Sequence, residues 1–584
     1  MRKMFIFAMV FGVIAGISAA AKAQSAERIS PRLQDALASK AAGETVAAWV
    51  FFTDKGPQAA ALLSEAEARL TPKALQRRLR NRGAGNLVDR HDLPVNAQYV
   101  QEVASRAARI RHKSRWLNAV SAEIEKSEIA KLAQLPFVKK IDLVRSARRP
   151  MPEVHPLSPS LHKGGDPGIH SLNYGPSLAQ NQQINVVALH DLGYNGSGVM
   201  VAMLDAGFNN LQHEALANLN ILHTWDFVNG DSNVEDEPGQ MGSGNHGTLT
   251  FSALAGFKEG ELIGPAYGAD FILAKTENTD YERHIEEDHW VAGAEWADSL
   301  GADIISSSLG YRDFDPGEFS YTWQDMNGDI AISTIGADIA ASRGILVVNS
   351  AGNEWEPIPP VQNTLIAPCD GDSVMAVGAV TESGNRASFS SMGPSADGRI
   401  KPDVMARGVS TACASPYSPT GYSTANGTSL SCPLAAGAAA LVLQVNPSAS
   451  NMQILQALRN TANNAGAPNN QYGWGIINAY NAAFAVTGMA GGEISLPDRI
   501  ELFPAYPNPF NPSTTIRYRV PQNGTATLTA FNLLGQQVAT LAEGPRAAGE
   551  HQVVWNAQGL PSGVYYLVLS AARQRQVQKV VLLK

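Results

Sequence analysis

Short apolar runs alternate with amphipathic stretches between residues 184 and 487. Two stretches have apolar residues at helical spacing and predict amphipathic helices, His289–Leu300 and Ser333–Arg343. The apolar runs are Gly198–Leu204, Ala269–Ala274, Ile304–Ser308, Ile345–Asn349 and Val374–Val380. Strands that are apolar on both faces and spaced by helices predict a parallel sheet covered on each side. The segment is therefore expected to be an α/β domain whose functional residues lie at the carboxyl ends of the strands.

Residues 24–150 show a mixed pattern that predicts a small α+β unit. The predicted strands are Thr45–Thr53, Trp116–Ile124 and Val138–Val144, and the predicted helices are Ala59–Arg82, Val100–Arg111 and Ser127–Gln134. The next stretch, Met151–Pro176, is rich in Pro, Gly, Ser and His and has no periodicity. It predicts an exposed linker, the kind of segment that a protease cuts.

Residues 495–584 alternate apolar and polar positions in short runs between Gly, Pro and Asn turns. The predicted strands are Thr514–Val520, Thr525–Asn532, Gln552–Trp555, Gly563–Ala571 and Val577–Leu583. Regular short strands of this kind predict a β-sandwich of immunoglobulin type.

The first residues predict export. Arg2 and Lys3 precede the apolar run Met4–Ile17, and Ala21-Lys22-Ala23 forms a small-residue cleavage site. These features are typical of a secretory signal peptide over residues 1–23. No later segment has the ~18 uninterrupted apolar residues that a membrane span needs. We therefore expect a chain that leaves the cytoplasm and has no transmembrane segment.

Charge divides the chain unevenly. Residues 24–150 hold 23 Lys and Arg against 13 Asp and Glu, a net of +10, whereas residues 151–584 hold 19 against 40, a net of −21. A basic segment is able to bind nucleic acid or an acidic partner. Because the acidic partner is present in the same chain, we favour docking of residues 24–150 on the rest of the molecule.

The three cysteines leave little room for disulfides. Cys369, Cys413 and Cys432 allow at most one bridge. If one forms, Cys369–Cys413 is the expected pair, which leaves Cys432 buried near Ser429. No Cys/His spacing matches a zinc site.

Ser429 stands where a glycine-containing turn meets a helix of small residues. Pro433, expected in the first turn where a missing N–H costs little, and the Ala-rich run after it predict that helix. The unpaired N–H groups of a helix start favour negative charge, which suits a serine that attacks a carbonyl and shelters an oxyanion. An ordinary N-cap is the alternative role for Ser429.

Three more polar residues follow or open predicted elements. Asp205 ends an apolar run, His246 lies in Gly-Asn-His-Gly-Thr, and Asn353 follows the run that ends at Asn349. Taken singly, each has an ordinary structural role: Asp205 as a cap, His246 as a loop residue and Asn353 as a turn former. Acyl transfer to serine needs a base, a carboxylate that orients that base, and donors for the oxyanion. Together with Ser429 they provide this set.

Five motifs in this order carry a family resemblance. They are MLDAG at Asp205, HGT at His246, SLG at Ser308, AGN at Asn353 and NGTS ending at Ser429. On these motifs residues 185–487 resemble the catalytic domain of the subtilisin-like serine proteases, whose triad follows the order Asp, His, Ser. The resemblance implies a three-layer parallel-sheet fold and hydrolysis of peptide bonds in proteins through an acyl-enzyme.

The resemblance also implies a role for each residue. Asp205 orients the base, His246 is the general base and acid, and Ser429 is the nucleophile. Asn353 and the N–H of Ser429 form the oxyanion hole, and the implied substrate-binding residues are Ser308, Leu309, Gly310, Ala351 and Gly352. Many subtilases have histidines where this chain has Leu249 and Leu434, a departure that concerns subgroup and specificity.

The flanking segments resemble further parts of such proteases. Residues 24–150 resemble a propeptide, which implies an intramolecular chaperone and inhibitor. Residues 495–584, with YPNPFNP, LGQQV and GLPSGVYYLVL, resemble the C-terminal sorting domain of type IX secretion substrates. That resemblance implies secretion or surface display from a Gram-negative envelope. The expected partners are protein substrates, the chain's own propeptide and the secretion machinery, without nucleic acid.

Metal binding has only weak signals. Asp325 to Asp329 places oxygens at alternate positions as calcium loops do, but no EF-hand glutamate follows, so the segment predicts a turn. The acidic stretch Asp226–Glu237 predicts a solvated loop. No cofactor is expected to be required. Because subtilases often carry structural calcium, calcium is retained as an expectation without assigned ligands.

Two other functions compete with the exported endopeptidase. A sedolisin-type acid protease shares the fold and a GTS serine but has Glu in place of the His, which His246 contradicts. A catalytically inactive surface-binding protein on the same scaffold would usually have lost a member of the triad, and none is lost here.

Overall fold

The computed structural model describes residues 27–41, 43–144, 154–156, 170–280, 285–312, 320–355, 363–488, 500–503, 505, 508–520, 524–546, 549–571 and 574–583. The predicted signal peptide and most of the predicted linker lie outside these residues. The chain forms two compact units, Met1–Thr487 and Gly488–Lys584.

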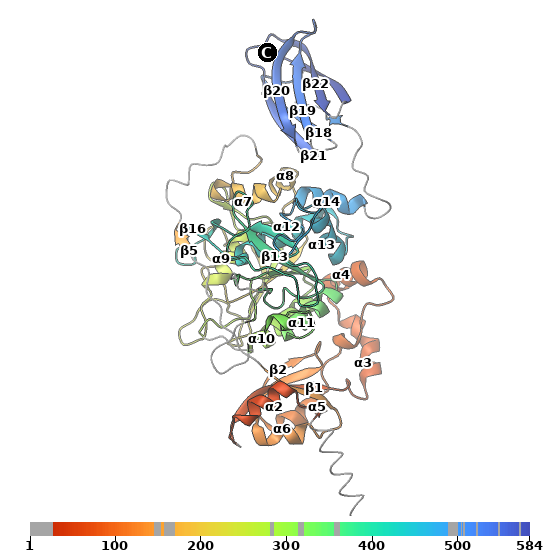
Figure 1. Cartoon of the computed structure of the whole chain (residues 1–584), viewed down its shortest axis with the longest axis vertical. Coiled ribbons are helices and arrows are strands. Elements are labelled where there is room, and N and C mark those ends of the chain that lie inside the picture. Colours follow the sequence, from red (N-terminus) through yellow and green to blue (C-terminus); the bar gives the residue numbers. More distant parts are fainter. Residues whose placement is uncertain are drawn as a thin grey trace, which may run out of the picture. The chain divides into compact units, whose positions relative to one another are not determined.

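A seven-stranded parallel sheet forms the centre of the first unit (Figure 1). Its order is β14-β13-β12-β11-β6-β10-β7. The strands are β6 (Met200–Asp205), β7 (Asn220–Asp226), β10 (Asp270–Lys275), β11 (Ile304–Ser307), β12 (Leu346–Ser350), β13 (Val374–Val380) and β14 (Val404–Arg407). All residues of β6, β11, β12 and β13 are buried, which confirms the predicted α/β class. The two strands that we did not predict are β7, a half-exposed edge strand, and β14, which has only four residues.

Helices cover both faces of this sheet. One buried cluster joins the sheet to α9, α12, α13 and α14, and a second joins its other face to α10 and α11. The bounds are α7 (Leu178–Gln183), α8 (Val187–His190), α9 (Asn245–Ala255), α10 (Ile285–Leu300), α11 (Ile332–Ser342), α12 (Thr428–Val445), α13 (Asn451–Asn460) and α14 (Ala479–Gly488). Among the described residues α12 alone is long and apolar enough to span a membrane, but 89% of it is buried in this domain, as in a core helix.

Residues 27–144 form an antiparallel sheet, in the order β2-β3-β1-β4, with helices packed beside it. The elements are α2 (Pro31–Ala38), β1 (Thr45–Phe52), α3 (Ala59–Ala66), α4 (Pro72–Arg82), α5 (Ala97–Ala104), β2 (Ala107–Ser114), β3 (Ala119–Glu125), α6 (Lys126–Leu132) and β4 (Val138–Leu143), with 3-10 turns at Glu67–Arg69 and Arg90–Asp92.

Two predicted helices in this part were wrong in extent. The predicted helix Ala59–Arg82 is two helices, because Thr71 caps a new helix that starts with Pro72. The predicted helix Val100–Arg111 ends at Ala104, and the residues after it form β2. Cross-strand pairing with β3 decides the conformation there, which the local pattern does not reveal.

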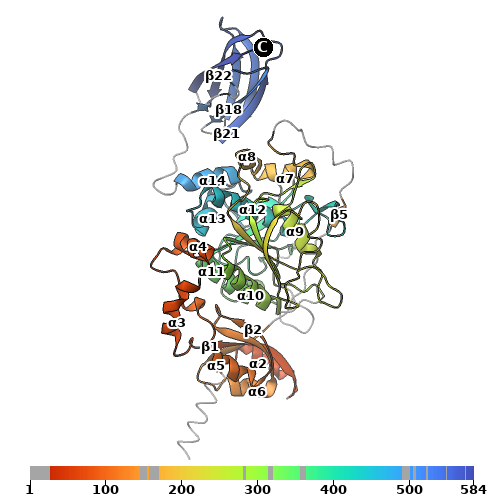
Figure 2. The same cartoon turned by 180° about the vertical axis from the view of Figure 1, so that it is seen from behind.

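The basic N-terminal segment docks on the acidic helix α10 (Figures 1 and 2). Asp298 accepts hydrogen bonds from Arg77 and Arg78, and it lies 3.1 Å from Arg115. One turn away, Glu295 accepts from Ser114 at 2.5 Å. Burial alone would raise the pKa of Asp298, but the three guanidinium groups outweigh it and lower that pKa. The docking inferred from charge is thus present in the precursor.

Asp298 offers a test of this docking. The variant Asp298→Ala leaves Arg77 buried without a carboxylate partner and leaves Arg78 with Asp92 alone, at a cost of about 3–5 kcal/mol. We expect the amides of β1 and β3 in the full-length precursor to exchange with solvent about 10²–10³ times faster, as measured by hydrogen exchange. The control is Glu65→Ala, which removes only an exposed ion pair with Arg69 and should change nothing measurable. Unchanged exchange in Asp298→Ala would contradict the role of this carboxylate.

A smaller sheet stands beside the main one, in the order β15-β16-β5. Its strands are β15 (Thr411–Ala414), β16 (Tyr422–Ala425) and β5 (Val154–Pro156). The linker prediction was therefore wrong for residues 154–156, which pair with β16 as a strand. A two-stranded pair, β8 (Phe257–Lys258) and β9 (Leu262–Ile263), completes the described strands of this unit.

The second unit contains two antiparallel sheets, β17-β18-β21 and β20-β19-β22-β23, around one apolar core. Its strands are β17 (Glu501–Leu502), β18 (Ser513–Val520), β19 (Gly524–Phe531), β20 (Gln537–Arg546), β21 (Gly549–Asn556), β22 (Gly563–Ala571) and β23 (Gln574–Leu582). This agrees with the predicted β-sandwich. Strand β20 was missed because its sequence lacks a clear apolar alternation.

All three cysteines are buried and unpaired, so the pairing Cys369–Cys413 is not formed. Cys369 donates to the carbonyl of Ala351 and belongs to the cluster under α10 and α11. Cys413 donates to the carbonyl of Ser423 in the small sheet. Cys432 lies in α12, and burial raises the pKa of its thiol to about 12. Each thiol is therefore a protonated core group.

Candidate active site

Three neighbouring strands bring predicted site residues to one edge of the main sheet. Asp205 is the last residue of β6, Ser308 follows β11, and Asn353 lies three residues after β12. These strands are adjacent and parallel, so their carboxyl ends meet at the same edge. At this edge the order of the sheet reverses, with β10 and β7 on one side of β6 and β11 on the other.

Asp205 holds the imidazole of His246. Its Oδ1 lies 2.5 Å from Nδ1 of His246, and both side chains are almost fully buried. The same carboxylate accepts from the N–H of Ala206 and from the hydroxyl of Thr250, each at 2.8 Å. These three contacts fix the carboxylate's orientation and leave Nε2 as the outer nitrogen of His246.

Thr250 was not predicted to take part in the site. It stands one helical turn after His246 on α9, so both side chains face the same carboxylate. The spacing of four residues within a predicted helix is a signal that sequence reasoning could have used.

His246 sits in the first turn of α9, close against the chain that follows β6. A side chain at Gly247 would come within 2.0 Å of the carbonyl oxygen of Gly207, so only glycine fits after the histidine. Nε2 of His246 is buried and has no hydrogen-bond partner among the described residues. The ring is therefore held from one side and has its second nitrogen available for a proton.

Ser429 is the second residue of α12, and it is not the N-cap. The cap is Gly427, whose φ of 144° requires glycine. The prediction that Pro433 lies in the first turn was wrong, because the helix begins at Thr428 and Pro433 lies inside it. A proline there has no N–H to donate to the carbonyl of Ser429, and the hydroxyl of Ser308 donates to that carbonyl at 2.8 Å instead. The hydrogen bond from Ser308, which replaces the missing helical bond, joins Ser429 to the end of β11.

A small apolar cluster joins the histidine helix to the serine helix. It contains Leu249 and Ala253 from α9, Leu430 from α12, and Cys413 and Ala425 from the hairpin β15–β16. Leu249 is one turn from His246, and Leu430 is next to Ser429. The cluster therefore fixes the two helices to each other close to His246 and Ser429. A leucine at position 249, where many subtilases have histidine, serves this packing.

The amide of Asn353 is held in one orientation. Its Oδ1 accepts from the N–H of Thr428 at 2.9 Å and from the hydroxyl of Thr428 at 3.0 Å. This leaves the Nδ2 donor on the other side of the amide, toward the turn at Gly427. Thr428, which was also not predicted, further accepts from the N–H of Gly352 at 3.2 Å.

The predicted substrate-binding residues line the ends of β11 and β12. Asn349 donates to the carbonyl of Leu309 at 3.0 Å. A side chain at Gly310 would come within 2.0 Å of Ile366, and Gly352 has a φ of 110°. Both positions therefore require glycine, and Ala351 between the strand and Gly352 is fully buried.

Among the described residues no group of three or more His, Cys, Asp or Glu side chains is arranged to hold a metal ion. Asp325 caps a 3-10 turn, Trp323–Asp325, and pairs with Arg32 at 2.6 Å, and residues 326–329 form a turn, as predicted. The prediction of a solvated loop over Asp226–Glu237 was wrong for Asp226, which ends β7 and is buried against Lys275. Further along, Asp236 accepts from the N–H of Gly244 at 2.7 Å. This loop therefore supports the chain before His246.

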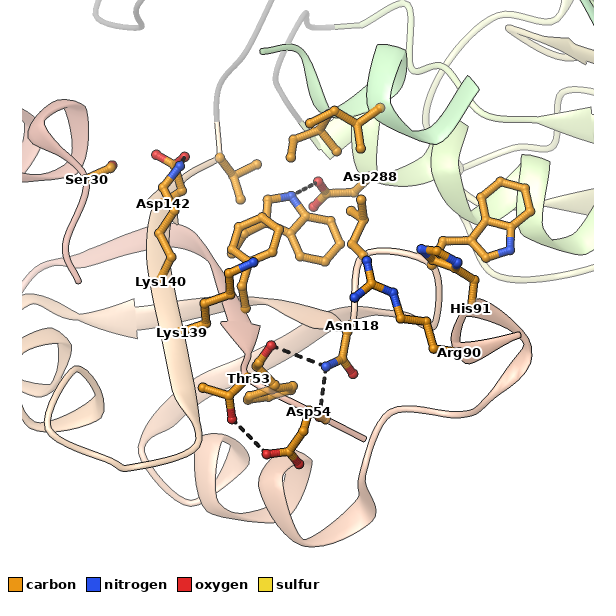
Figure 3. Close-up of a pocket in the computed structure, with 18 of the residues that line it drawn as sticks. Ser30, Thr53, Asp54, Arg90, His91, Asn118, Lys139, Lys140, Asp142 and Asp288 are labelled. Carbon is orange, nitrogen blue, oxygen red and sulfur yellow. Dashed lines mark hydrogen bonds and ion pairs between the residues drawn. The ribbon is translucent and has the colours of Figure 1, made fainter. Parts of the chain in front are cut away.

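A cavity of about 900 Å³ lies elsewhere, between the N-terminal sheet and helices α10 and α11 (Figure 3). Trp49 and Asp288 line it and share a hydrogen bond of 2.7 Å. None of Asp205, His246 and Ser429 lines this cavity. It belongs to the docking surface of the precursor and not to the candidate active site.

Comparison with known families identifies all three parts of the chain. The Subtilase family model matches residues 196–475, a Peptidase S8 propeptide domain of Bacteroidota matches residues 47–156, and a Secretion system C-terminal sorting domain matches residues 504–583.

Two subtilisins agree with the Subtilase family match. Subtilisin BL of Lederbergia lenta is 35% identical over 51% of this chain and 95% of its own. Subtilisin NAT of Bacillus subtilis subsp. natto is 31% identical over 65% of this chain and 84% of its own. Among solved structures, MycP1 with its N-terminal propeptide removed matches 55% of this chain and 98% of its own, with 22% identity and a TM-score of 0.41.

Fold, site and relatives together define a serine-type endopeptidase made with a propeptide and a type IX sorting domain. The chain belongs to the subtilase family. Its sorting domain indicates export, with secretion or surface localisation.

Proposed function

We propose that this subtilase hydrolyses peptide bonds in proteins with Asp205, His246 and Ser429 as its catalytic triad. The observation that carries the proposal is the 2.5 Å contact between Asp205 and Nδ1 of His246, on a ring whose Nε2 has no partner among the described residues. Nε2 takes the proton of the Ser429 hydroxyl as the oxygen attacks the carbonyl carbon. Asp205 stabilises the imidazolium that forms.

The oxyanion is stabilised at the start of α12. The N–H of Ser429 and Nδ2 of Asn353 donate to it, and the amide of Asn353 is kept in place by Thr428. Fixed donors need no reorganisation when charge develops, which is why such groups lower the barrier. His246 then returns its proton to the leaving amine, and water hydrolyses the ester on Ser429.

The substrate chain lies extended along the residues that follow β11. Ser308, Leu309 and Gly310 supply backbone groups on one side, and Ala351 and Gly352 form the floor beside Asn353. An added strand of this kind gives affinity through the main chain, whereas the side-chain pockets give specificity.

The docked N-terminal segment acts as inhibitor and folding template. It covers two carboxylates of α10 with its own cations, Asp288 with Arg111 and Asp298 with Arg77, as expected for a partner that must fit the folded enzyme. The sorting domain would direct the precursor across both membranes of a Gram-negative envelope.

The inactive surface-binding alternative is disfavoured by the Asp205–His246 contact, and the acid-protease alternative by the histidine itself. A covalent probe separates these from the proposal. A fluorophosphonate should label Ser429 in the mature protein, as read by peptide mass spectrometry, and His246→Ala should abolish the labelling because the hydroxyl then lacks its base. Equal labelling of native and heat-unfolded protein would contradict an activated serine.

A further inference from the structure

Two of the proposed substrate-binding residues are glycines that face the same isoleucine. A methyl group at Gly310 would lie 2.0 Å from Cδ1 of Ile366, and a methyl group at Gly352 would lie 3.1 Å from its Cγ2. Gly310 follows β11 and Gly352 follows β12, and these two strands are adjacent in the sheet. Ile366 is only 2% exposed. Its side chain therefore fills the gap between the two substrate-binding segments.

Ile366 faces away from the core that its neighbours join. Leu365 and Ala367 belong to the apolar cluster under α10 and α11, whereas Ile366 belongs to neither of the two clusters that cover the sheet. The chain is extended at Ala367, which pairs antiparallel with Tyr311. Because successive side chains of an extended chain point to opposite sides, the residue before Ala367 is directed out of the core. Ile366 thus packs against the glycine backbones.

Hydrogen bonds anchor the backbone around Ile366 to both substrate-binding segments. The N–H of Tyr311 donates to the carbonyl of Ala367 at 2.8 Å, and the N–H of Ala367 donates back at 3.1 Å. On the other side, the thiol of Cys369 donates to the carbonyl of Ala351, and its N–H donates to the carbonyl of Ile366 at 3.0 Å. Isoleucine is also stiff about its first side-chain bond because it is branched at Cβ. The side chain therefore has little freedom to leave the gap.

The filled gap lies beside the candidate oxyanion hole. Gly352 precedes Asn353, and its N–H donates at 3.2 Å to the hydroxyl of Thr428, the residue before Ser429. In the proposed reaction the attacked carbonyl lies between Ser429 and Asn353, and the substrate runs along the segment after β11. The substrate residue that carries this carbonyl, which is the residue before the cleaved bond, therefore lies over the gap. Its side chain is the one that has to enter it.

We propose that Ile366 determines specificity by restricting the residue before the cleaved bond to a small one, such as Gly, Ala or Ser. The inference deepens the proposed function and rests on it. A small side chain ends above Ile366, whereas a Leu or Phe of the substrate would overlap its Cδ1 and Cγ2. The expected substrates are proteins with extended segments in which a small residue precedes the cut.

The first measurement compares peptide amides of one fluorogenic amine that differ only in the residue before the cleaved bond. With wild-type enzyme, kcat/KM for the Ala peptide should exceed kcat/KM for the Phe peptide by about 10²-fold or more, since each methylene that a pocket does not admit costs about 10-fold or more. Equal values, or a higher value for the Phe peptide, overturn the inference.

Truncating the isoleucine should open the gap. In Ile366→Gly, the ratio of kcat/KM for the Phe peptide to kcat/KM for the Ala peptide should rise about 10²-fold, and the smaller truncation Ile366→Ala should give an intermediate rise. If the glycine variant does not fold, the alanine variant decides alone. A ratio that does not rise in Ile366→Ala overturns the role of Ile366.

The neighbouring Leu365 supplies the matched control. Its side chain is fully buried in the cluster under α10 and α11, so Leu365→Val should lower the unfolding temperature. It should leave the Phe-to-Ala ratio unchanged, because this side chain faces away from the gap. A rise as large as that of Ile366→Ala would show a general loosening of the segment and would overturn the inference.

A double variant fills the same gap from the opposite wall. The methyl group of Gly310→Ala has no room beside Ile366 but should fit once Ile366→Gly has removed that side chain. The double variant should therefore lose about 10-fold of the gain in the Phe-to-Ala ratio. A double variant that accepts the Phe peptide as well as Ile366→Gly does would show that the substrate side chain enters elsewhere, which overturns the inference.

Labelling of Ser429 separates failure of this inference from failure of the proposed function. Each protein is titrated with the fluorophosphonate, and kcat is expressed per labelled Ser429. Wild-type enzyme that is labelled but prefers the Phe peptide leaves the proposed function standing and overturns the role of Ile366. Loss of both labelling and cleavage in the folded wild-type enzyme contradicts the proposed function and, with it, this inference.

Discussion

The variant Ser429→Ala should lose about 10⁶ of the wild-type kcat for peptide hydrolysis and should accumulate as uncut precursor. Without the hydroxyl no ester forms, and the oxyanion donors and bound substrate supply the small remainder; the subtilisin serine variant sets this scale. The measurement is hydrolysis of a fluorogenic peptide by wild type and variant, each checked for folding by its thermal unfolding.

A matched control stands two residues further along the same helix. Ser431 is also buried, and its hydroxyl donates to the carbonyl of Thr428 at 2.9 Å. Ser431→Ala therefore removes an equal number of atoms and one internal hydrogen bond, at a cost of about 1 kcal/mol in stability. It should keep kcat within a few-fold of wild type. A Ser429→Ala protein that retains a hundredth of the wild-type kcat would remove this serine from the proposed role.

Asp205→Asn should lower kcat by about 10⁴ with little change in KM. The asparagine keeps the shape but has no charge to stabilise the imidazolium, and its amide favours the wrong tautomer of His246; this scale is that of the equivalent change in trypsin-like enzymes. The proposed substrate-binding residues Ser308–Gly310 have no described hydrogen bond to this carboxylate, so we expect binding to be preserved. Steady-state kinetics of autoprocessed or externally matured enzyme give both constants.

The control for this change is another buried carboxylate that ends a strand. Asp226 is the last residue of β7 and pairs with Lys275 at 3.2 Å, with both side chains fully buried. Asp226→Asn should lower the free energy of unfolding because it leaves Lys275 without its partner. It should leave the kcat of the folded fraction close to wild type. A loss of kcat as large as that of Asp205→Asn would mean that the effect comes from general damage to the sheet.

The parallel sheet and the position of the site were predictable because they depend on local pattern. Fully apolar runs such as Val374–Val380 are strands only in a covered sheet, and a polar residue at such a run's end must lie at one edge. The sequence could not predict β2, whose residues pair across to β3, nor β5, which has three residues and no pattern of its own. Both depend on a partner strand distant in sequence.

The contacts within the site could not be predicted from the sequence for a similar reason. Pro433 was expected in the first turn, but the helix begins at Thr428 and the proline leaves a carbonyl for Ser308. The support that Thr428 gives to Asn353 joins residues 75 positions apart. Such contacts follow from how two strands and a helix converge, and no single stretch of sequence contains them.

The acidic face of α10 has a consequence once maturation is complete. In the precursor Asp298 is covered by Arg77 and Arg78, and under the proposed maturation those cations would leave with the propeptide. Residues 151–584, which carry a net charge of −21, then meet other copies of themselves with like charge. Repulsion between like net charges would slow their encounter, and with it the digestion of one mature molecule by another.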